Sequence, residues 1–348
     1  MRSQVFLLPL FLSLLASPLL SLAQTPSPEF LLSQLSSASR EQSYRGVFSF
    51  EQGGKIETFG VEHLVHQGRE YERLFRTTGP RQAFSRQSEL TCGTIGGKLL
   101  KGLQLTSSKG GVFGLSHFYR IALSGEDRVA GREAWVVHLV PTDAYRYGMA
   151  LTIDKETQLL LRYVVFDAQK NIALERMQFA SLLLDISLDN VPEFDTSELA
   201  VATRQCANDT LALSTSSPWR PTWLPPGFLR VAHEYSELHG HVESYTDGLS
   251  SFSVFISGMF DGASSDDALS ISELFESANV TTVAPDKARG LLLQGVSSRG
   301  ATTALLSLIP RPKGTLSVSV VGEIPARVAQ RITLSVTHIH GETKEPSP

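Results

Sequence analysis

The chain has 348 residues, with 31 Lys and Arg against 35 Asp and Glu, and a formal net charge of −4 at neutral pH. This length exceeds what one hydrophobic core usually organises, so it favours two domains over one. The slight acidic excess offers no basic surface to a phosphate backbone, which argues against a nucleic-acid partner.

The first residues combine the three parts of a secretory signal. Arg2 supplies a positive charge, an apolar run extends from Val5 to Leu22, and the small residues Ser21 and Ala23 mark a cleavage site. An uncleaved membrane anchor is the alternative, because the run is near the lower length limit for crossing a bilayer of about 30 Å. Prolines and serines within the run favour cleavage. We therefore expect residues 1–23 to be a signal peptide and the mature chain to be exported.

The mature chain is predicted to begin with an amphipathic helix. Ser27 is a capping residue, Pro28 suits the first helical position, and Glu29 places an acid in the first turn. The apolar residues that follow share one broad stripe at helical spacing: Phe30, Leu31, Leu35 and Ala38.

Beyond this helix, apolar residues recur at every second position, which is typical of strands with one buried face. Short polar turns such as 53–54, 154–157 and 167–171 separate the runs, so successive strands are predicted to pair as an antiparallel meander. Such a sheet needs a cover or must curl towards a barrel, and the opening helix and segment 110–123 are the available covers. The alternating residues include Trp135, Val137, Leu139, Tyr147, Met149, Leu151, Ile153, Leu159, Leu161, Tyr163 and Val165.

A change in composition separates the two predicted domains. Residues 201–218 are rich in Ser, Thr and Ala and poor in large apolar residues, as expected of a linker. The sequence therefore predicts a first domain over 24–200 and a second, smaller one over 219–340. The polar tail 341–348 is expected to be disordered.

The second domain carries both strand and helix patterns. Strand 241–245, the turn 246–248 and the alternating residues of 252–256 predict a hairpin. A further strand covers 316–320. After Pro325, the residues Val328, Ile332 and Val336 repeat at helical spacing, which predicts a final helix.

An aromatic and proline-rich segment opens this second domain. Rigid aromatic rings supply contact area at low entropic cost, so they are candidates for a partner-binding surface or for a domain interface. We favour the interpretation that they pack within the protein, because large aromatic side chains are mostly buried for packing. The candidates are Trp219, Trp223, Leu224 and Phe228, together with Tyr245 and Phe252 of the hairpin.

The two cysteines, Cys92 and Cys206, could form one disulfide in an oxidising compartment. The alternative is a pair of buried thiols that act as small hydrophobic side chains.

No pattern in the chain predicts chemistry at a reactive centre. The pairs His239 with His241 and His338 with His340 have strand spacing but lack a Cys or carboxylate at a convincing distance, so neither a metal nor another cofactor is predicted. No nucleophile with its base and no recognisable pair of catalytic carboxylates rises above background. The sequence therefore indicates a binding protein rather than an enzyme.

Several short blocks, taken together, identify a family. In order they are EQSYRGVF at 41–48, DRVAGR at 127–132, YRYG at 145–148, IDKET at 153–157, LERMQF at 174–179, WRPTWLPPGF at 219–228, DG at 247–248, FSVFI at 252–256 and VVGEIP at 320–325. In this combination and order, across nearly the whole mature chain, the sequence resembles the MucB/RseB family of periplasmic regulators.

The resemblance implies an α+β protein. Its first domain would be a large, curved antiparallel half-barrel with covering helices, similar to the lipoprotein carriers LolA and LolB, followed by a small α+β domain. The implied partner is the periplasmic domain of an RseA/MucA-type anti-sigma factor, which the protein would shield from proteolysis, with lipid or lipopolysaccharide loosening the complex. A periplasmic lipid or lipoprotein carrier is the alternative function, although the carriers consist of the first domain alone.

Overall fold

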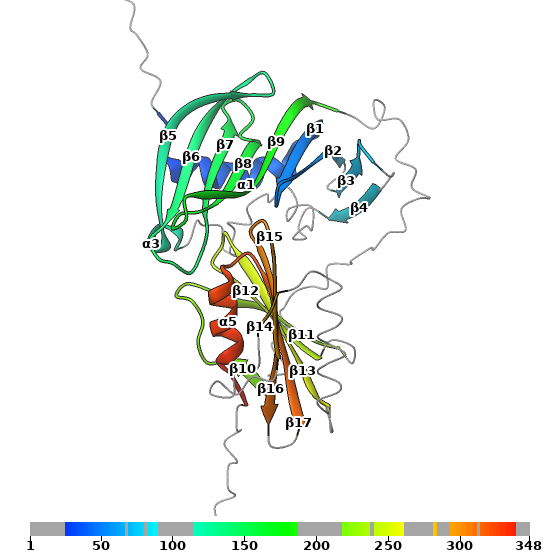
Figure 1. The fold of residues 1–348 in the computed structure, drawn as a ribbon. Coiled ribbons are helices and arrows are strands. Elements are labelled where there is room, and N and C mark those ends of the chain that lie inside the picture. The colour runs from blue at the N-terminus through cyan, green and yellow to red at the C-terminus, as the bar shows by residue number, and fades with distance from the viewer. Residues whose placement is uncertain are drawn as a thin grey trace, which may run out of the picture.

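The structure is a computed structural model, and two antiparallel sheets dominate the residues that it describes (Figure 1). We call 25–186 the first domain and 218–338 the second domain. The predicted signal peptide, the tail 341–348, both cysteines and nearly all of the linker 201–218 lie outside the described residues. The described residues are 25–66, 69–79, 83–89, 114–186, 218–236, 240–260, 281–283, 293–311 and 314–338.

Helix α1 (Pro28–Glu41) confirms the predicted opening helix. The Ser27 hydroxyl accepts a hydrogen bond from the backbone N–H of Phe30 at 3.1 Å, and Pro28 occupies the first turn. Leu31, Leu32 and Leu35 are almost completely buried against the larger sheet, so this face of the helix anchors it. Phe30 was wrongly placed on the buried stripe, because its side chain is 53% exposed.

The first domain is a nine-stranded antiparallel sheet that curves around α1 (Figure 1). Its order is β4-β3-β2-β1-β9-β8-β7-β6-β5, so two meanders meet where β1 pairs with β9. The predicted fold class is thus confirmed for this domain. The strands are β1 (Tyr44–Gln52), β2 (Lys55–His66), β3 (Arg69–Arg76), β4 (Ala83–Glu89), β5 (Tyr119–Val129), β6 (Arg132–Pro141), β7 (Gly148–Asp154), β8 (Leu160–Asp167) and β9 (Ile172–Leu184).

Two details of this sheet differ from the sequence prediction. The pairing of β7 with β8 shifts by one residue between Thr152 and Ile153, so Leu161 leaves the inner face and packs with Val129 and Ala134 instead. The end of segment 110–123 contributes only one short helical turn, α3 (Leu115–Phe118), before β5 begins at Tyr119. From that residue onward the segment is an edge strand rather than a cover.

The second domain is a seven-stranded antiparallel sheet in the order β11-β12-β13-β17-β16-β15-β14. Helix α5 (Ala326–Leu334) packs on β16 and β17 through buried Val328, Ala329 and Ile332. The predicted hairpin and the predicted strand 316–320 are confirmed. The strands are β11 (Leu229–Ser236), β12 (Gly240–Thr246), β13 (Ser251–Phe260), β14 (Thr281–Val283), β15 (Leu293–Arg299), β16 (Thr302–Arg311) and β17 (Gly314–Gly322).

The final helix ends earlier than its apolar spacing suggested. The backbone N–H of Ser335 donates to the carbonyl of Ile332, and this turn stops the helix. Val336 therefore begins strand β18 (Val336–His338), which pairs with β10 (Trp219–Pro221). The start and the end of the second domain are thereby held side by side.

Within the part of the chain that the structure covers, no helix combines the length and the apolar character needed to cross a membrane.

Candidate functional site: the junction of the two domains

Three of the aromatic candidates lie together in the core of the second domain. Phe252 is 2% exposed, and its ring centroid lies 5.1 Å from that of Phe228 and 5.2 Å from that of Tyr245. All three side chains are buried among the apolar residues of β13, β17 and α5. All three residues therefore occupy packing positions. The ring of Phe252 is too buried to contact a partner.

The other three candidates are half-buried at the edge of the same core. Trp219 packs edge-on against His338 of β18, with 4.8 Å between the ring centroids. Trp223 lies between the domains, because the guanidinium of Arg331 stacks 3.8 Å from its ring and Tyr145 of the first domain contacts it edge-on. Leu224 completes this group. Trp223 thus contacts residues of both domains.

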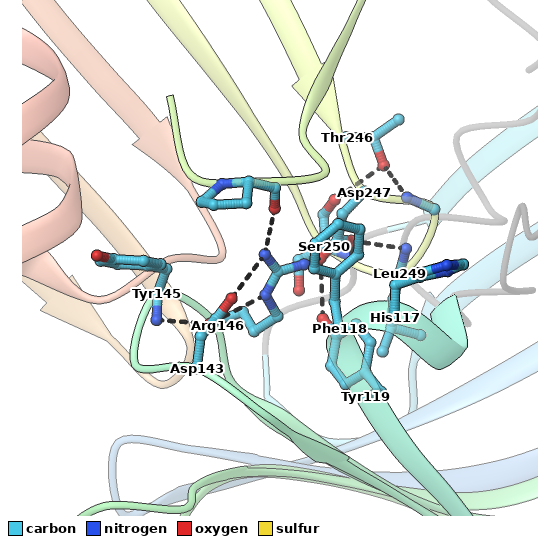
Figure 2. Close-up of polar contacts among 12 residues, drawn as sticks. His117, Phe118, Tyr119, Asp143, Tyr145, Arg146, Thr246, Asp247, Leu249 and Ser250 are labelled. Carbon is cyan, nitrogen blue, oxygen red and sulfur yellow. Dashed lines mark hydrogen bonds and ion pairs between the residues drawn. The ribbon is translucent and has the colours of Figure 1, made fainter. Parts of the chain in front are cut away.

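The junction itself is centred on a buried arginine that sequence reasoning did not select. Arg146 lies in the loop between β6 and β7 (Figure 2). Its side chain is fully buried. It donates to Asp247 Oδ2 of the second domain at 2.6 Å and to the carbonyl of Pro226 at 2.5 Å. Within its own loop it donates to Asp143 Oδ1 at 3.1 Å. One guanidinium therefore joins a β-hairpin turn and the chain segment that opens the second domain.

Asp247 accepts hydrogen bonds at both oxygens of its carboxylate. Besides Arg146, the hydroxyl of Tyr119 donates to Oδ2 at 3.0 Å, and the backbone N–H groups of Leu249 and Ser250 donate to Oδ1 at 2.9 and 2.8 Å. Burial first, and the charge of Asp247 second, raise the pKa of Tyr119 well above its usual value. The phenol therefore stays protonated and acts as the donor.

Aromatic rings enclose the guanidinium of Arg146. Its central carbon lies 4.6 Å from the ring centroid of Phe118 and 5.2 Å from that of Phe228, one from each domain. Gly227 permits this approach, because its φ of +86° favours glycine and a Cβ there would lie 2.2 Å from the Phe118 ring. Pro226 and Gly227 thus shape the junction.

A second contact joins the domains at the turn between β15 and β16, which points towards the first domain in Figure 1. The buried Ala301 belongs to the hydrophobic core of the first domain, and its backbone N–H donates to Glu175 at 3.4 Å.

A third contact comes from helix α5. Its Arg327 donates to the carbonyl of Ala144 at 2.8 Å and to the side chain of Gln169 at 2.7 Å. The relative position of the domains therefore rests on several points.

The sequence did contain a signal for this site. The blocks at 145–148, 219–228 and 247–248 are among those that resemble the MucB/RseB family, and the structure brings all three together around Arg146. Single-residue reasoning selected aromatic rings and overlooked the charged residues Arg146 and Asp247 within those blocks.

Histidines do not gather into a larger cluster in the described part of the chain. His233 Nε2 and His241 Nδ1 lie 3.3 Å apart on neighbouring strands. Among the described residues, no three of His, Cys, Asp and Glu are grouped closely enough to hold a metal ion. His239 and His340 of the two predicted pairs lie outside the described residues.

Comparison with known proteins gives consistent similarities over both domains. The chain is 29% identical over 314 residues to the sigma factor AlgU regulatory protein MucB of Pseudomonas aeruginosa, covering 88% of this chain and 89% of that protein. The complex structure of P. aeruginosa MucA/MucB aligns with 28% identity and a TM-score of 0.63, covering 90% and 99% of the two chains. A crystal structure of MucB in complex with MucA(peri) aligns with 26% identity and a TM-score of 0.61, with the same coverage.

Two family models match successive parts of the sequence. The model described as the MucB/RseB N-terminal domain matches residues 27–200, and the model described as the MucB/RseB C-terminal domain matches residues 214–337. Each matched range contains one of the two sheets, and the junction residues Arg146 and Asp247 fall in different models. On this evidence the chain belongs to the MucB/RseB family.

Proposed function

We propose that this protein is a periplasmic binding regulator that associates with the periplasmic domain of a membrane anti-sigma factor of the RseA/MucA type. Bound in this way, it shields the anti-sigma factor from regulated proteolysis and so keeps the stress response low. The observation that carries the proposal is the similarity over both domains to MucB, which has been solved together with MucA. We further propose that residues 1–23 are removed on export and that 201–218 link domains 24–200 and 219–340.

The geometry supports binding by both domains at once. The junction contacts fix the two sheets relative to one another, so a partner that reaches across them meets a preformed surface and loses less entropy on binding. The names of the relatives describe regulators, and we propose that this chain likewise acts by binding rather than by catalysis.

Lipid sensing is a second part of the proposal. An apolar cavity of about 20 Å³ lies between α1 and the larger sheet, and this volume has room for roughly one water molecule. An acyl chain is larger than this cavity, so its entry there would require α1 or a neighbouring strand to move, which would link lipid binding to the shape of the first domain. The cavity is lined by Ser39, Tyr44, Leu159, Leu160, Met177, Phe179 and Leu182.

A direct binding experiment tests the main proposal. The mature chain is titrated by calorimetry with the purified periplasmic domain of the anti-sigma factor from the same cell, and the half-life of that factor is compared with and without the gene. We expect a stoichiometric complex and a shorter half-life in the deletion strain. The periplasmic domain of an unrelated single-pass membrane protein is the control. Absence of binding together with an unchanged half-life would refute the proposal, and lipoprotein recovered with the chain from envelope extract would favour the carrier.

In this proposal, the six aromatic and apolar candidates stabilise the second domain by packing and do not contact the partner. Truncating Trp223 to alanine is expected to lower the free energy of unfolding by about 2 kcal/mol, less than for a fully buried tryptophan, since its ring is half-buried between Arg331 and Tyr145. Denaturant titration and calorimetry on the same variant separate packing from partner contact. A lower midpoint with unchanged affinity of the folded fraction is the expected result, whereas lost affinity at an unchanged midpoint would make Trp223 a contact residue.

A further inference from the structure

The contact between Arg146 and Asp247 is built so that each side keeps a partner if the domains separate. Arg146 retains Asp143 of its own loop, whose carboxylate lies 3.0 Å from the guanidinium. Asp247 retains the N–H groups of Leu249 and Ser250 in its own turn. Separation therefore exposes two charged groups to water and leaves neither without a hydrogen-bond partner, which keeps the cost of opening low.

A buried ion pair at this place favours a defined geometry more than it favours stability. Removing two charges from water offsets much of their attraction, and an apolar pair of similar volume often stabilises as well or better. The fork of the guanidinium meets Asp247 and the carbonyl of Pro226 in one orientation only. The pair thus selects one arrangement of the domains.

Apolar packing across the junction is limited in the described part of the chain. The second domain contributes two buried side chains to the core of the first, Leu249 and Ala301, and both lie in hairpin turns. Contacts of this kind between domains resemble transient protein interfaces, whose default is relative motion. The ion pair is therefore one of a few contacts that hold the arrangement, beside those of Ala301, Arg327 and Trp223.

We propose that Arg146 and Asp247 form a reversible latch that holds the two domains in the arrangement that binds the partner. Arg146 is then a positioning residue, which acts on the partner through the orientation of the domains and not by touching it. The latch is inferred from contacts within this chain. Only its expected effect on affinity for the anti-sigma factor rests on the proposed function.

Two single variants and one conservative variant test the latch. Arg146→Met and Asp247→Asn each remove one charge, and Arg146→Lys keeps the charge while losing the forked geometry. Small-angle scattering of the full mature chain measures domain separation, and hydrogen exchange measures protection of the loop 143–147 and the turn 247–250. Circular dichroism checks that both sheets remain folded. Arg162→Met is the matched control, because Arg162 pairs with Asp127 inside the first domain.

The expected result is a larger radius of gyration and faster exchange at the junction in Arg146→Met and Asp247→Asn, with Arg146→Lys in between. Affinity for the partner domain should fall about tenfold or more in the open variants, within the usual range of coupling between a conformational equilibrium and binding. The control should match the unaltered chain in every measurement. Should Arg146→Met fail to fold, Asp247→Asn and Arg146→Lys carry the same comparison.

Other outcomes overturn the latch or its role. Unchanged scattering and exchange in folded Asp247→Asn and Arg146→Lys would show that the pair does not hold the domains. Open domains with unaltered affinity would show that the latch does not position the binding surface. Failure of the unaltered chain to bind would refute the proposed function instead, while scattering would still decide whether the pair is a latch.

Discussion

Phe252→Ala is expected to lower the free energy of unfolding by about 3–5 kcal/mol. The side chain is 2% exposed and packs against the rings of Phe228 and Tyr245, so its removal leaves a cavity that two rigid aromatic rings cannot close. Denaturant unfolding monitored by tryptophan fluorescence measures the loss.

Phe255→Ala on the same strand is the matched control for Phe252. Its side chain is half-buried on the opposite face of the sheet, so the same truncation should cost clearly less. Equal losses at the two positions would contradict the assignment of Phe252 to the core. Affinity of the folded fraction for the partner should stay unchanged in both variants, in keeping with a packing role.

Asp154→Ala is expected to destabilise the first domain by about 3 kcal/mol, near the lower end of the effect of breaking a buried ion pair. Asp154 is 1% exposed, pairs with Arg132, and accepts the backbone N–H groups of Glu156 at 2.8 Å and Thr157 at 3.4 Å. Its hydrogen bond is also the largest cause that raises the pKa of Arg132. Thermal and denaturant unfolding of the variant should both show the loss.

Glu156→Ala provides the comparison, since Glu156 pairs with the same Arg132 at 2.7 Å but its side chain is 81% exposed. An exposed pair contributes about 0–1 kcal/mol, so this variant should remain close to the unaltered chain. If Asp154→Ala were as mild as Glu156→Ala, the buried pair of Asp154 and Arg132 would not contribute the expected stability.

Much of the fold could be predicted because local patterns and tertiary packing agree. Ser27 and Pro28 begin α1, alternation marks most strands, and the order of the sequence blocks identifies the family. The failures are places where tertiary packing overrides local spacing. Leu161 has strand spacing but is the extra residue of a bulge, and Val336 has helical spacing but follows the turn that ends α5.

The candidate site was harder to predict than the fold. The aromatic candidates were found because large rings are conspicuous in sequence, and packing was the favoured interpretation. The bond between Arg146 and Asp247 joins residues 101 positions apart, and no local pattern distinguishes these two charged residues from solvated ones. Only the block that surrounds each of them gave a hint, and that hint came from resemblance rather than from physical chemistry.

The pairing of β1 with β9 has a consequence for the order in which the first domain can fold. Ser49 and Gln178 face each other across this pairing although 129 residues separate them, so its closure must await most of the first domain. Strands β5 to β8 pair only with neighbours in sequence, and β9 joins them through β8, so this half of the sheet can assemble locally. Until it does, one edge of β1 offers unpaired backbone groups to other chains, and aggregation at this stage is the hazard that chaperones would have to prevent.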